Sequence, residues 1–235
     1  MCLTAVRKNG MALCYVKDQT EEICIEAAKQ DGRVLMYVKN QTEEMCWIAV
    51  RQNGRALEYV KDKTEEICWE AVKRDSTALQ FVENQTEEIC LEAVKQSGYS
   101  LQYVKEQTEE ICLEAVMEYG DALQYVKDPT EEMCIIAINW DADNLEHIKE
   151  PTEEMCIMAV KQDGMLLGSI YNQTEEMCYE SVKQDYRALE YVDDQTEEIC
   201  RLALSLIPDD KPNHVTIVLK CIRDEEMQER MREIY

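Results

Sequence analysis

This chain of 235 residues contains twelve cysteines, whose thiols could form disulfides or bind a metal ion. Ten of them recur every 22 residues from Cys2 to Cys200, and only Cys14 and Cys221 fall outside this series. The sequence has no Cys-x-x-Cys pair and only two histidines, His147 and His214, so it lacks the spacing of a zinc site. We therefore expect no metal and no other cofactor.

The regular spacing of the ten cysteines also argues against disulfides. If each occupies the same place in successive helical layers, neighbouring cysteines lie about one helix-packing distance, roughly 8–10 Å, apart. That separation exceeds the limit of about 7 Å between the Cα atoms of a disulfide. We interpret these cysteines as small, polarisable core residues and predict a reducing compartment.

Paired glutamates, such as Glu21 and Glu22, recur with the same spacing. A catalytic pair of acids would be expected once in the chain rather than in every copy. The sequence also contains no glycine-rich phosphate loop, no nucleophile elbow and no cluster of metal ligands. We expect a protein that is not an enzyme.

These recurring residues belong to a 22-residue repeat, which is copied eight times without insertion over residues 19–194. Residues 1–18 form a partial copy and residues 195–207 begin another, so the predicted helical repeat array covers 1–207. Pro208 and Pro212 interrupt the pattern, and we expect 208–235 to be a C-terminal capping segment, helical from Asp224 onwards.

We number the positions of the repeat from 1, at Gln19, to 22, at Asn40. Residues at particular positions then indicate where a helix begins and ends. Asp or Asn at position 22, such as Asp62, predicts an N-cap, and the glutamate at position 3 would complete a capping box. Glycine at position 14, such as Gly54, predicts a left-handed residue that ends the helix. Positions 1–12 should form one helix and positions 15–21 a second, short one, whose apolar spacing favours a helix over the alternative, a strand.

The apolar residues of the first helix fall on one face, at positions 5, 6, 9 and 10, as in Ile67, Cys68, Ala71 and Val72. A single 22-residue unit cannot bury this face by itself, whereas stacked units can. The predicted fold class is therefore all-α: an α-solenoid of tandem 22-residue two-helix repeats with a C-terminal cap.

The strong negative charge of the chain restricts its partners. Asp and Glu number 49 against 25 Lys and Arg, a formal net charge of −24. Such a surface repels phosphate, so we expect no nucleic acid bound by direct phosphate contact. No apolar run approaches the roughly 18–20 residues of a membrane span, and we expect no membrane partner.

The residue type at position 7 differs from copy to copy, whereas many other positions of the repeat keep the same residue. Such variable positions are typical of the binding surface of a solenoid. The large apolar side chains at position 7, on the margin of the helix's apolar face, could line a groove for a partner helix or peptide. The alternative is that they pack against the next helix. The copies over residues 129–172 depart furthest from the consensus, at Trp140, Asn144, His147, Gly168 and Ser169, and are the best candidates for a specialised zone. The predicted partner-binding residues at position 7 are Trp47, Trp69, Leu91, Leu113, Ile135, Ile157 and Tyr179.

The string TEEICLEAVKQSGYSLQYVKEQ (86–107) and its siblings resemble the repeats of domain of unknown function 4116. The resemblance covers roughly residues 1–200 and rests on the T-E-E-[IM]-C-x-x-A-V core followed by A-L-x-Y-V. Because these repeats are abundant in giant DNA viruses of amoebae, it implies a viral or virus-derived origin. It supplies no catalytic residues.

We expect a non-enzymatic scaffold or adaptor that binds a protein partner, in the cytoplasm of a host cell or in a viral factory. One alternative is a structural or virion component that self-associates through its N-terminal layer. Another is an acidic decoy that binds basic proteins, which the net charge of −24 suggests.

Overall fold

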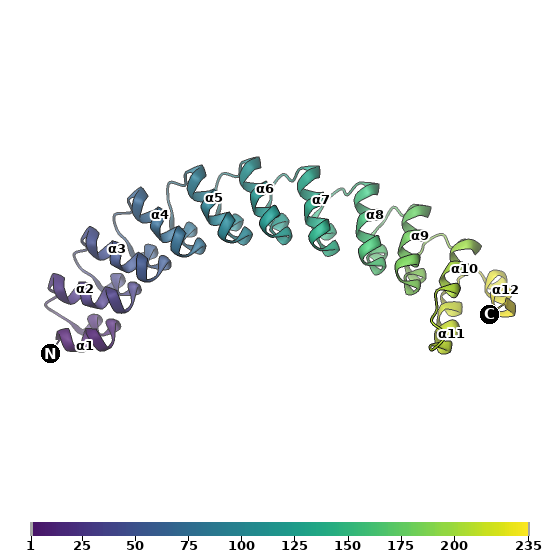
Figure 1. Ribbon diagram of the computed structural model, residues 1–235, viewed down its shortest axis with the longest axis horizontal. Helices are drawn as coiled ribbons and strands as arrows, with labels where there is room; N and C mark the ends of the chain where they lie inside the picture. Colours follow the sequence, from purple (N-terminus) through teal and green to yellow (C-terminus); the bar gives the residue numbers. More distant parts are fainter. Residues whose placement is uncertain (1, 235) are drawn as a thin grey trace. The chain divides into compact units, whose positions relative to one another are not determined.

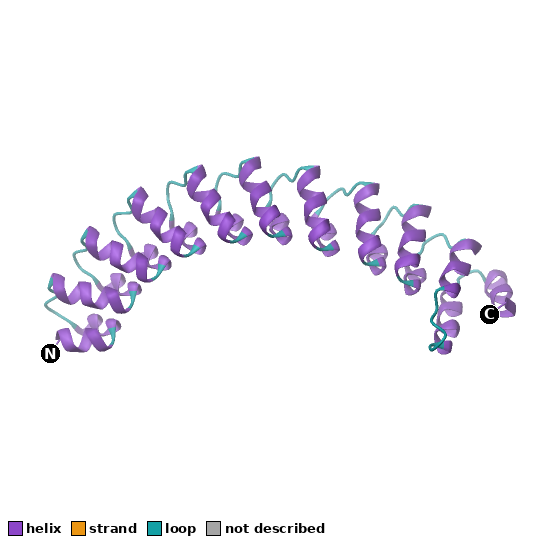
Figure 2. Ribbon diagram, in the orientation of Figure 1, coloured by secondary structure: helices purple, strands orange, loops and turns teal. Residues whose placement is uncertain are grey.

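Residues 2–234 are described by a computed structural model of the chain, so Met1 of the predicted array and Tyr235 of the predicted cap lie outside the described residues. This part of the chain contains α-helices and 3₁₀ helices and no strand, as Figure 2 shows. The α-helices are α1 (Cys2–Lys8), α2 (Glu21–Gln30), α3 (Glu43–Gln52), α4 (Glu65–Arg74), α5 (Glu87–Gln96), α6 (Glu109–Glu118), α7 (Glu131–Trp140), α8 (Glu153–Gln162), α9 (Glu175–Gln184), α10 (Glu197–Ser205), α11 (Pro212–Cys221) and α12 (Glu225–Ile234).

A 3₁₀ helix follows each of the first nine α-helices, so every copy of the repeat contains two helices. In each complete copy the α-helix occupies positions 3–12 and the 3₁₀ helix positions 14–19, which confirms the choice of helix over strand for the second element. The 3₁₀ helices are η1 (Gly10–Tyr15), η2 (Gly32–Tyr37), η3 (Gly54–Tyr59), η4 (Ser76–Phe81), η5 (Gly98–Tyr103), η6 (Gly120–Tyr125), η7 (Ala142–His147), η8 (Gly164–Ser169) and η9 (Tyr186–Tyr191).

The chain divides into two compact units, Met1–Pro129 and Thr130–Tyr235. In the first unit each α-helix packs against the next and each 3₁₀ helix against the next, in chain order (Figure 1). In the second unit α7 to α10 follow one another in the same way, and α11 packs against α10 and η9. Packing between successive copies is the arrangement of an all-α solenoid, as predicted.

The predicted apolar face forms the core. Ile67, Cys68, Ala71 and Val72 of α4 are at most 5% exposed, and the equivalent residues of the other complete copies are also buried in most cases. The alanine at position 9 is fully buried in the first seven complete copies, where its small side chain lets neighbouring helices approach closely.

The N-cap prediction was wrong by two positions. Each complete α-helix begins at the glutamate of position 3, and its N-cap is the preceding threonine. In α4 the Thr64 hydroxyl accepts a hydrogen bond from the Ile67 N–H at 3.4 Å, whereas Asp62 is exposed outside the helix. Glu65 therefore lies in the first turn, where its charge favours the helix dipole, but it forms no capping box.

The conformation predicted for the position-14 glycine was also wrong. No glycine among residues 2–234 has a positive φ, and the α-helix ends instead at a residue in extended conformation, such as Asp75. Glycine is needed for close approach: a Cβ on Gly54 would lie 2.4 Å from the carbonyl oxygen of Ala71, in the next copy. The equivalent distances at four other glycines, Gly10, Gly32, Gly98 and Gly164, are between 2.3 and 2.6 Å.

The residue at position 13 both ends the α-helix and caps the 3₁₀ helix. The Asp75 N–H donates to the carbonyl of Ala71 at 2.9 Å, and the Asp75 carboxylate accepts from the Thr77 N–H at 3.0 Å. An Asp or Asn occupies this position in most copies. Their short polar side chains are suited to such local bonds, which explains the sharp turn between the two helices.

Candidate functional site

The predicted partner-binding residues lie at the same place on seven successive α-helices, α3 to α9. They are half-buried: Trp69 is 38% exposed and Tyr179 is 37% exposed. The Trp47 ring is held on its own helix, since its Nε1–H donates to Glu43 at 3.3 Å and the Arg51 guanidinium lies 4.9 Å from its centroid. These positions suit either contact with a partner or packing between helices, so the binding role stays a prediction.

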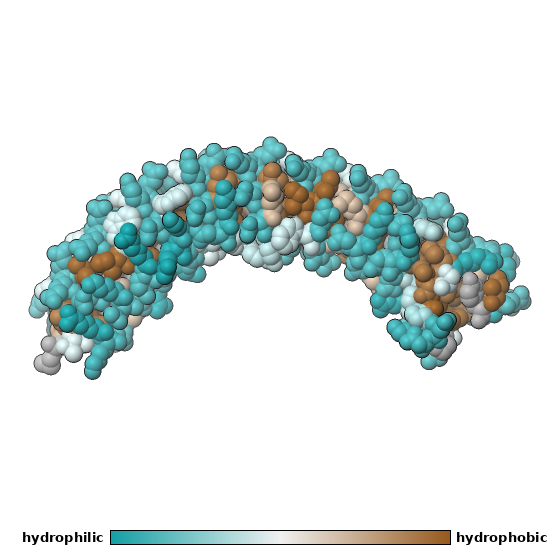
Figure 3. All heavy atoms as spheres, viewed as in Figure 1, coloured by the Kyte–Doolittle hydropathy of each residue, from teal (hydrophilic) through white to brown (hydrophobic). Residues whose placement is uncertain are grey.

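Ion pairs between side chains join successive α-helices in the first unit. The Arg51 guanidinium pairs with Glu70 of the next helix at 3.2 Å, and the Arg7 guanidinium pairs with Glu26 at 2.9 Å. Hydrogen bonds from Lys29 and Arg7 lower the pKa of Glu26. In the first unit the surface is mainly hydrophilic, with apolar atoms in separate small patches (Figure 3).

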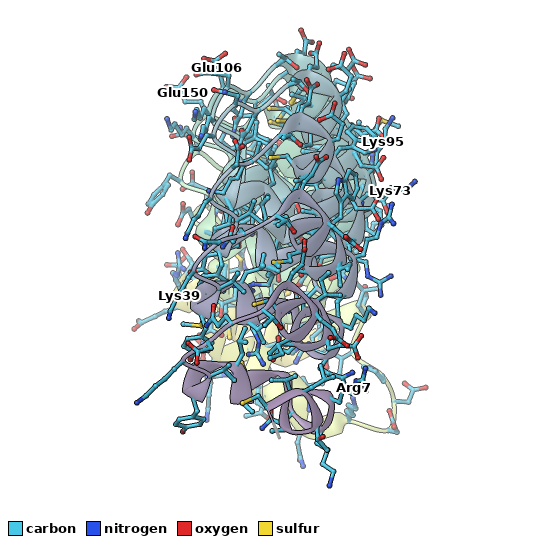
Figure 4. All side chains as sticks on the ribbon, turned by 90° about the vertical axis from the view of Figure 1, so that its left-hand side faces the viewer. Arg7, Lys39, Lys73, Lys95, Glu106 and Glu150 are labelled. Carbon is cyan, nitrogen blue, oxygen red and sulfur yellow. The ribbon has the colours of Figure 1, made fainter. Side chains whose placement is uncertain are left out.

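The loops that join each 3₁₀ helix to the next α-helix form a second face. In Figure 4, Arg7, Lys73 and Lys95, on the helices of the first unit, lie on the opposite side from Lys39 and Glu106, on its loops. Four grooves lie between consecutive loops, and residues at positions 21, 22 and 2 recur in their linings. None of the seven predicted partner-binding residues lines any of these four grooves.

A glutamine at position 1 ties most of these loops together, in what we call the glutamine ladder. The Gln85 Nε2–H donates to the carbonyls of Tyr103 at 2.9 Å and Leu79 at 3.2 Å, while its Oε1 accepts from the Lys105 N–H at 2.9 Å. The carboxamide thereby joins backbone groups of two successive copies. Gln41, Gln173 and Gln195 link backbone groups in this way. Gln19 and Gln107 make the equivalent bonds to positions 19 and 21 of their own copies.

A second set of bonds joins consecutive loops in the first unit, which we call the lysine ladder. A lysine ammonium at position 21 donates to the backbone carbonyl of position 21 in the preceding copy. The distance is 2.9 Å from Lys39 to Lys17 and 2.7 Å from Lys105 to Glu83. Lys61 and Lys127 make the same bond.

Both ladders are interrupted where residues 151–172 follow residues 129–150. Pro151 stands at position 1 and has no carboxamide, and Tyr171 stands in place of the lysine with its side chain exposed. The groove here has a volume of about 700 Å³, against about 510, 400 and 260 Å³ for grooves beside Gln19, Gln85 and Gln195. We call it the Pro151 groove.

In the copy that begins at Lys63, an ion pair replaces the hydrogen bonds of the missing glutamine. There the Lys63 ammonium lies 3.6 Å from the carboxylate of Glu83, at position 21, and the Lys63 side chain is 20% exposed. An ion pair thus spans positions that the glutamine ladder joins elsewhere. No ion pair replaces the ladder at Pro151 within the described residues, because Tyr171 carries no charge to pair with.

The floor of the Pro151 groove is apolar and its rim is charged. Leu145, Cys156 and Met177 are buried and line its floor, with the half-buried Ile148 and Ile170 beside them. Burial raises the pKa of the Cys156 thiol, and the neighbouring Glu153 adds to this effect. The thiol therefore stays protonated and poorly nucleophilic near neutral pH, which suits a packing role. The charged rim residues are Glu146, Lys149, Glu150 and Glu153.

The divergent residues that marked this zone in the sequence have different roles. Ser169 lines the Pro151 groove and replaces the larger tyrosine that most other copies have at this position. The buried Asn144 donates to the carbonyl of Ala137 at 3.0 Å, and His147 is half-buried, with Nε2 3.6 Å from the Glu146 carboxylate. Gly168 leaves room for the ring of Tyr191.

Pro151 and Tyr171 were not recognised as site residues from the sequence. The sequence predicted that the helix begins at position 1, which Pro151 occupies, whereas this position precedes the N-cap Thr152. The available signal was the loss of both the glutamine at position 1 and the lysine at position 21, without the pair of opposite charges that Lys63 and Glu83 supply where these residues are also lost.

Among residues 2–234 no group of three or more His, Cys, Asp and Glu side chains is placed to hold a metal ion. None of the helices described over this range is both long and apolar enough to cross a membrane.

Comparison with protein families matches the chain to the family described as Domain of unknown function (DUF4116), in five overlapping stretches: residues 1–42, 20–64, 42–85, 64–108 and 86–130. The overlap of successive matches follows the tandem repeat. Comparison with curated proteins and with solved structures gave no match.

Proposed function

The chain belongs to the family described as Domain of unknown function (DUF4116), and we propose that it is a non-enzymatic α-solenoid that binds another protein, as a scaffold or adaptor. The observation that carries this proposal is the Pro151 groove. Where residues 151–172 follow residues 129–150, neither the glutamine nor the lysine bond joins the loops, and apolar side chains line a groove beside charged ones. Apolar floors with polar rims are typical of peptide-binding sites.

Affinity capture with matched variants tests the proposal. The tagged chain would be used as bait in lysates of amoebae, both uninfected and infected with a giant DNA virus. We expect Pro151→Gln to reduce recovery of a captured protein at least tenfold, because the introduced carboxamide fills the groove. Pro129→Gln makes the same change at another position 1 and is the control. The Trp47→Ala/Trp69→Ala double variant tests the predicted row on the α-helices, and equal recovery of every protein by all four chains would contradict the proposal.

A second candidate, an acidic decoy for basic proteins, rests on the formal net charge of −24. Salt distinguishes the two functions. Attraction between exposed charges is largely screened beyond about 8 Å at physiological ionic strength, so the affinity of a decoy should fall steeply as salt is added. Binding in an apolar groove should change little. Self-association through the N-terminal layer also stays a prediction, which a single monomeric mass by light scattering at high concentration would contradict.

We further propose that the protein is viral or virus-derived and acts in a reducing compartment, the cytoplasm of the host or a viral factory. The family resemblance supports the origin, and the buried free cysteines support the compartment. Mass spectrometry of amoebae before and after infection tests the origin, since peptides of this chain should appear only after infection.

A further inference from the structure

In the Pro151 groove, no glutamine binds the backbone groups that the glutamine ladder joins in other copies. The groups equivalent to those bound by Gln85 are the carbonyls of Ser169 and Leu145 and the N–H of Tyr171, and all three residues line the groove. Within residues 2–234 the Tyr171 N–H has no hydrogen-bond acceptor and the Ser169 carbonyl no donor. The Leu145 carbonyl accepts only the Ile148 N–H at 3.1 Å, which leaves one of its lone pairs available.

The backbone keeps the conformation that receives a carboxamide although none is supplied. Ile170, between Ser169 and Tyr171, has φ −94° and ψ 118°. The equivalent Val104, beside the bound carboxamide of Gln85, has φ −75° and ψ 120°. Since φ differs by about 20° and ψ hardly at all, the carbonyl and N–H of the Pro151 groove are directed much as they are where a glutamine binds.

We infer that the Pro151 groove binds the side-chain carboxamide of a glutamine or asparagine in an extended segment of the partner protein. This inference rests on the proposed function and names the chemistry of its ligand. The carboxamide donates to the Ser169 and Leu145 carbonyls and accepts from the Tyr171 N–H, as Gln85 does for the equivalent groups. A carboxylate lacks the N–H donors, and an alkyl side chain would leave the three backbone groups unpaired.

The charges at the rim favour basic residues on either side of this carboxamide. Three carboxylates, from Glu146, Glu150 and Glu153, surround the groove with one ammonium, from Lys149. Lys or Arg next to the inserted residue would lie near this net negative charge, whereas acidic neighbours would be repelled. The segment we expect is therefore basic, with a central glutamine or asparagine.

Short peptides test this chemistry on the full chain. The probes are N-acetylated and C-amidated Lys-Ala-Gln-Ala-Lys and its analogues with a central Glu or Leu. We expect the glutamine peptide to shift the Tyr171 amide resonance in ¹⁵N–¹H NMR spectra saturably, and to bind at least tenfold more tightly than either analogue. Equal binding of the glutamine and leucine peptides, or no saturable shift of Tyr171 with any peptide, would overturn the inference.

Pro151→Gln supplies a carboxamide from the chain itself and should compete with the probe. We expect the glutamine peptide to lose at least tenfold in affinity for this variant, while Pro129→Gln binds it like the unmodified chain. The substitution restores the residue of other copies, so the thermal midpoint should not fall, and unfolding would not explain the loss. If partner capture depends on Pro151 but the peptides do not discriminate, the carboxamide inference fails and the proposed function stands.

Discussion

The thiol at position 6 is the most repeated chemical group of the chain, and its surroundings keep it unreactive. Nine cysteines from Cys24 to Cys200 are buried, and all twelve are free. Burial raises the pKa of the Cys90, Cys178 and Cys200 thiols to about 11. Because the thiolate is the reactive form, a raised pKa lowers reactivity at neutral pH, in addition to the steric protection of the core.

We predict two classes of thiol in the folded protein. With a chromogenic disulfide reagent in mildly alkaline buffer without reductant, the exposed Cys2 and Cys14 should react first. Cys90, Cys178 and Cys200, whose pKa is raised to about 11, should react at least roughly a hundredfold more slowly. Burial also raises the pKa of the other six buried thiols, which should react more slowly than Cys2 and Cys14. In concentrated guanidinium chloride all twelve should react quickly. Fewer than twelve reactive thiols after denaturation would indicate disulfides and contradict a reducing compartment.

At the scale of the helices, the threonine at position 2 has the capping role that the sequence analysis assigned to position 22. Both residue types are good N-caps, and they lie two residues apart on either side of position 1. Local sequence therefore allows two registers for the start of the helix. The selected register places the position-1 glutamine outside the helix, where its side chain can reach the backbone of two copies.

Two substitutions test whether Thr64 or Asp62 caps the helix. Thr64→Ala removes the hydroxyl that accepts the Ile67 N–H and should lower the free energy of unfolding by about 1 kcal/mol. Asp62→Ala removes an exposed side chain and should change it by less than about 0.5 kcal/mol. Urea denaturation followed by circular dichroism measures both variants. If Asp62→Ala lowered the free energy of unfolding more than Thr64→Ala, Asp62 would be the N-cap, as the sequence suggested.

Glycine is needed at position 14 for close approach of the next copy, and not for the left-handed conformation that the sequence suggested. We predict that Gly54→Ala destabilises the protein by about 1–3 kcal/mol, because the new Cβ would lie 2.4 Å from the Ala71 carbonyl. Ser76 and Tyr186 occupy this position in other copies, so the backbone can adjust at a cost.

Gly168→Ala is the matched control for this substitution, because its Cβ would meet only the Tyr191 ring, 2.8 Å away, and a side chain can move. Thermal unfolding should show a smaller change for Gly168→Ala than for Gly54→Ala. Equal losses would mean that backbone approach does not explain the glycine at position 14.

At the scale of the whole chain, the repeat period and the apolar positions were sufficient to predict the fold. The period of 22 residues and the apolar face at positions such as Ile67 and Val72 determine which surfaces must be buried, and stacking successive copies buries them. These are local properties of each copy. The reason for Gly54 depends on a contact with the next copy, which a single repeat does not contain.

The candidate site was only partly predictable for the same reason. Divergence identified the copies over 129–172, but the Pro151 groove arises from two substitutions 20 residues apart, at Pro151 and Tyr171. Each is unremarkable in its own helix or loop. Their joint effect requires knowledge that positions 1 and 21 meet across the groove, which the hydrogen bonds of Gln85 reveal.

Packing between successive copies also predicts how the array responds to a core defect. Leu57, in η3, is fully buried, and η3 packs against α4, α3, η2 and η4. Leu57→Ala should cost about 2–5 kcal/mol of local stability. Since stability in such arrays is a sum over repeats and their nearest neighbours, the effect should be concentrated in the adjoining copies.

Hydrogen exchange measured by mass spectrometry should locate this loss. We expect Leu57→Ala to accelerate exchange most in α3 and α4, less in α5, and least in α6 of the same unit, because each copy contacts only its neighbours. Leu101→Ala, the equivalent change in η5, should move the maximum to α5 and α6, which contact η5. Uniform acceleration across α1 to α6 in both variants would show that the first unit unfolds as a single cooperative block, and nearest-neighbour packing would then not describe its stability.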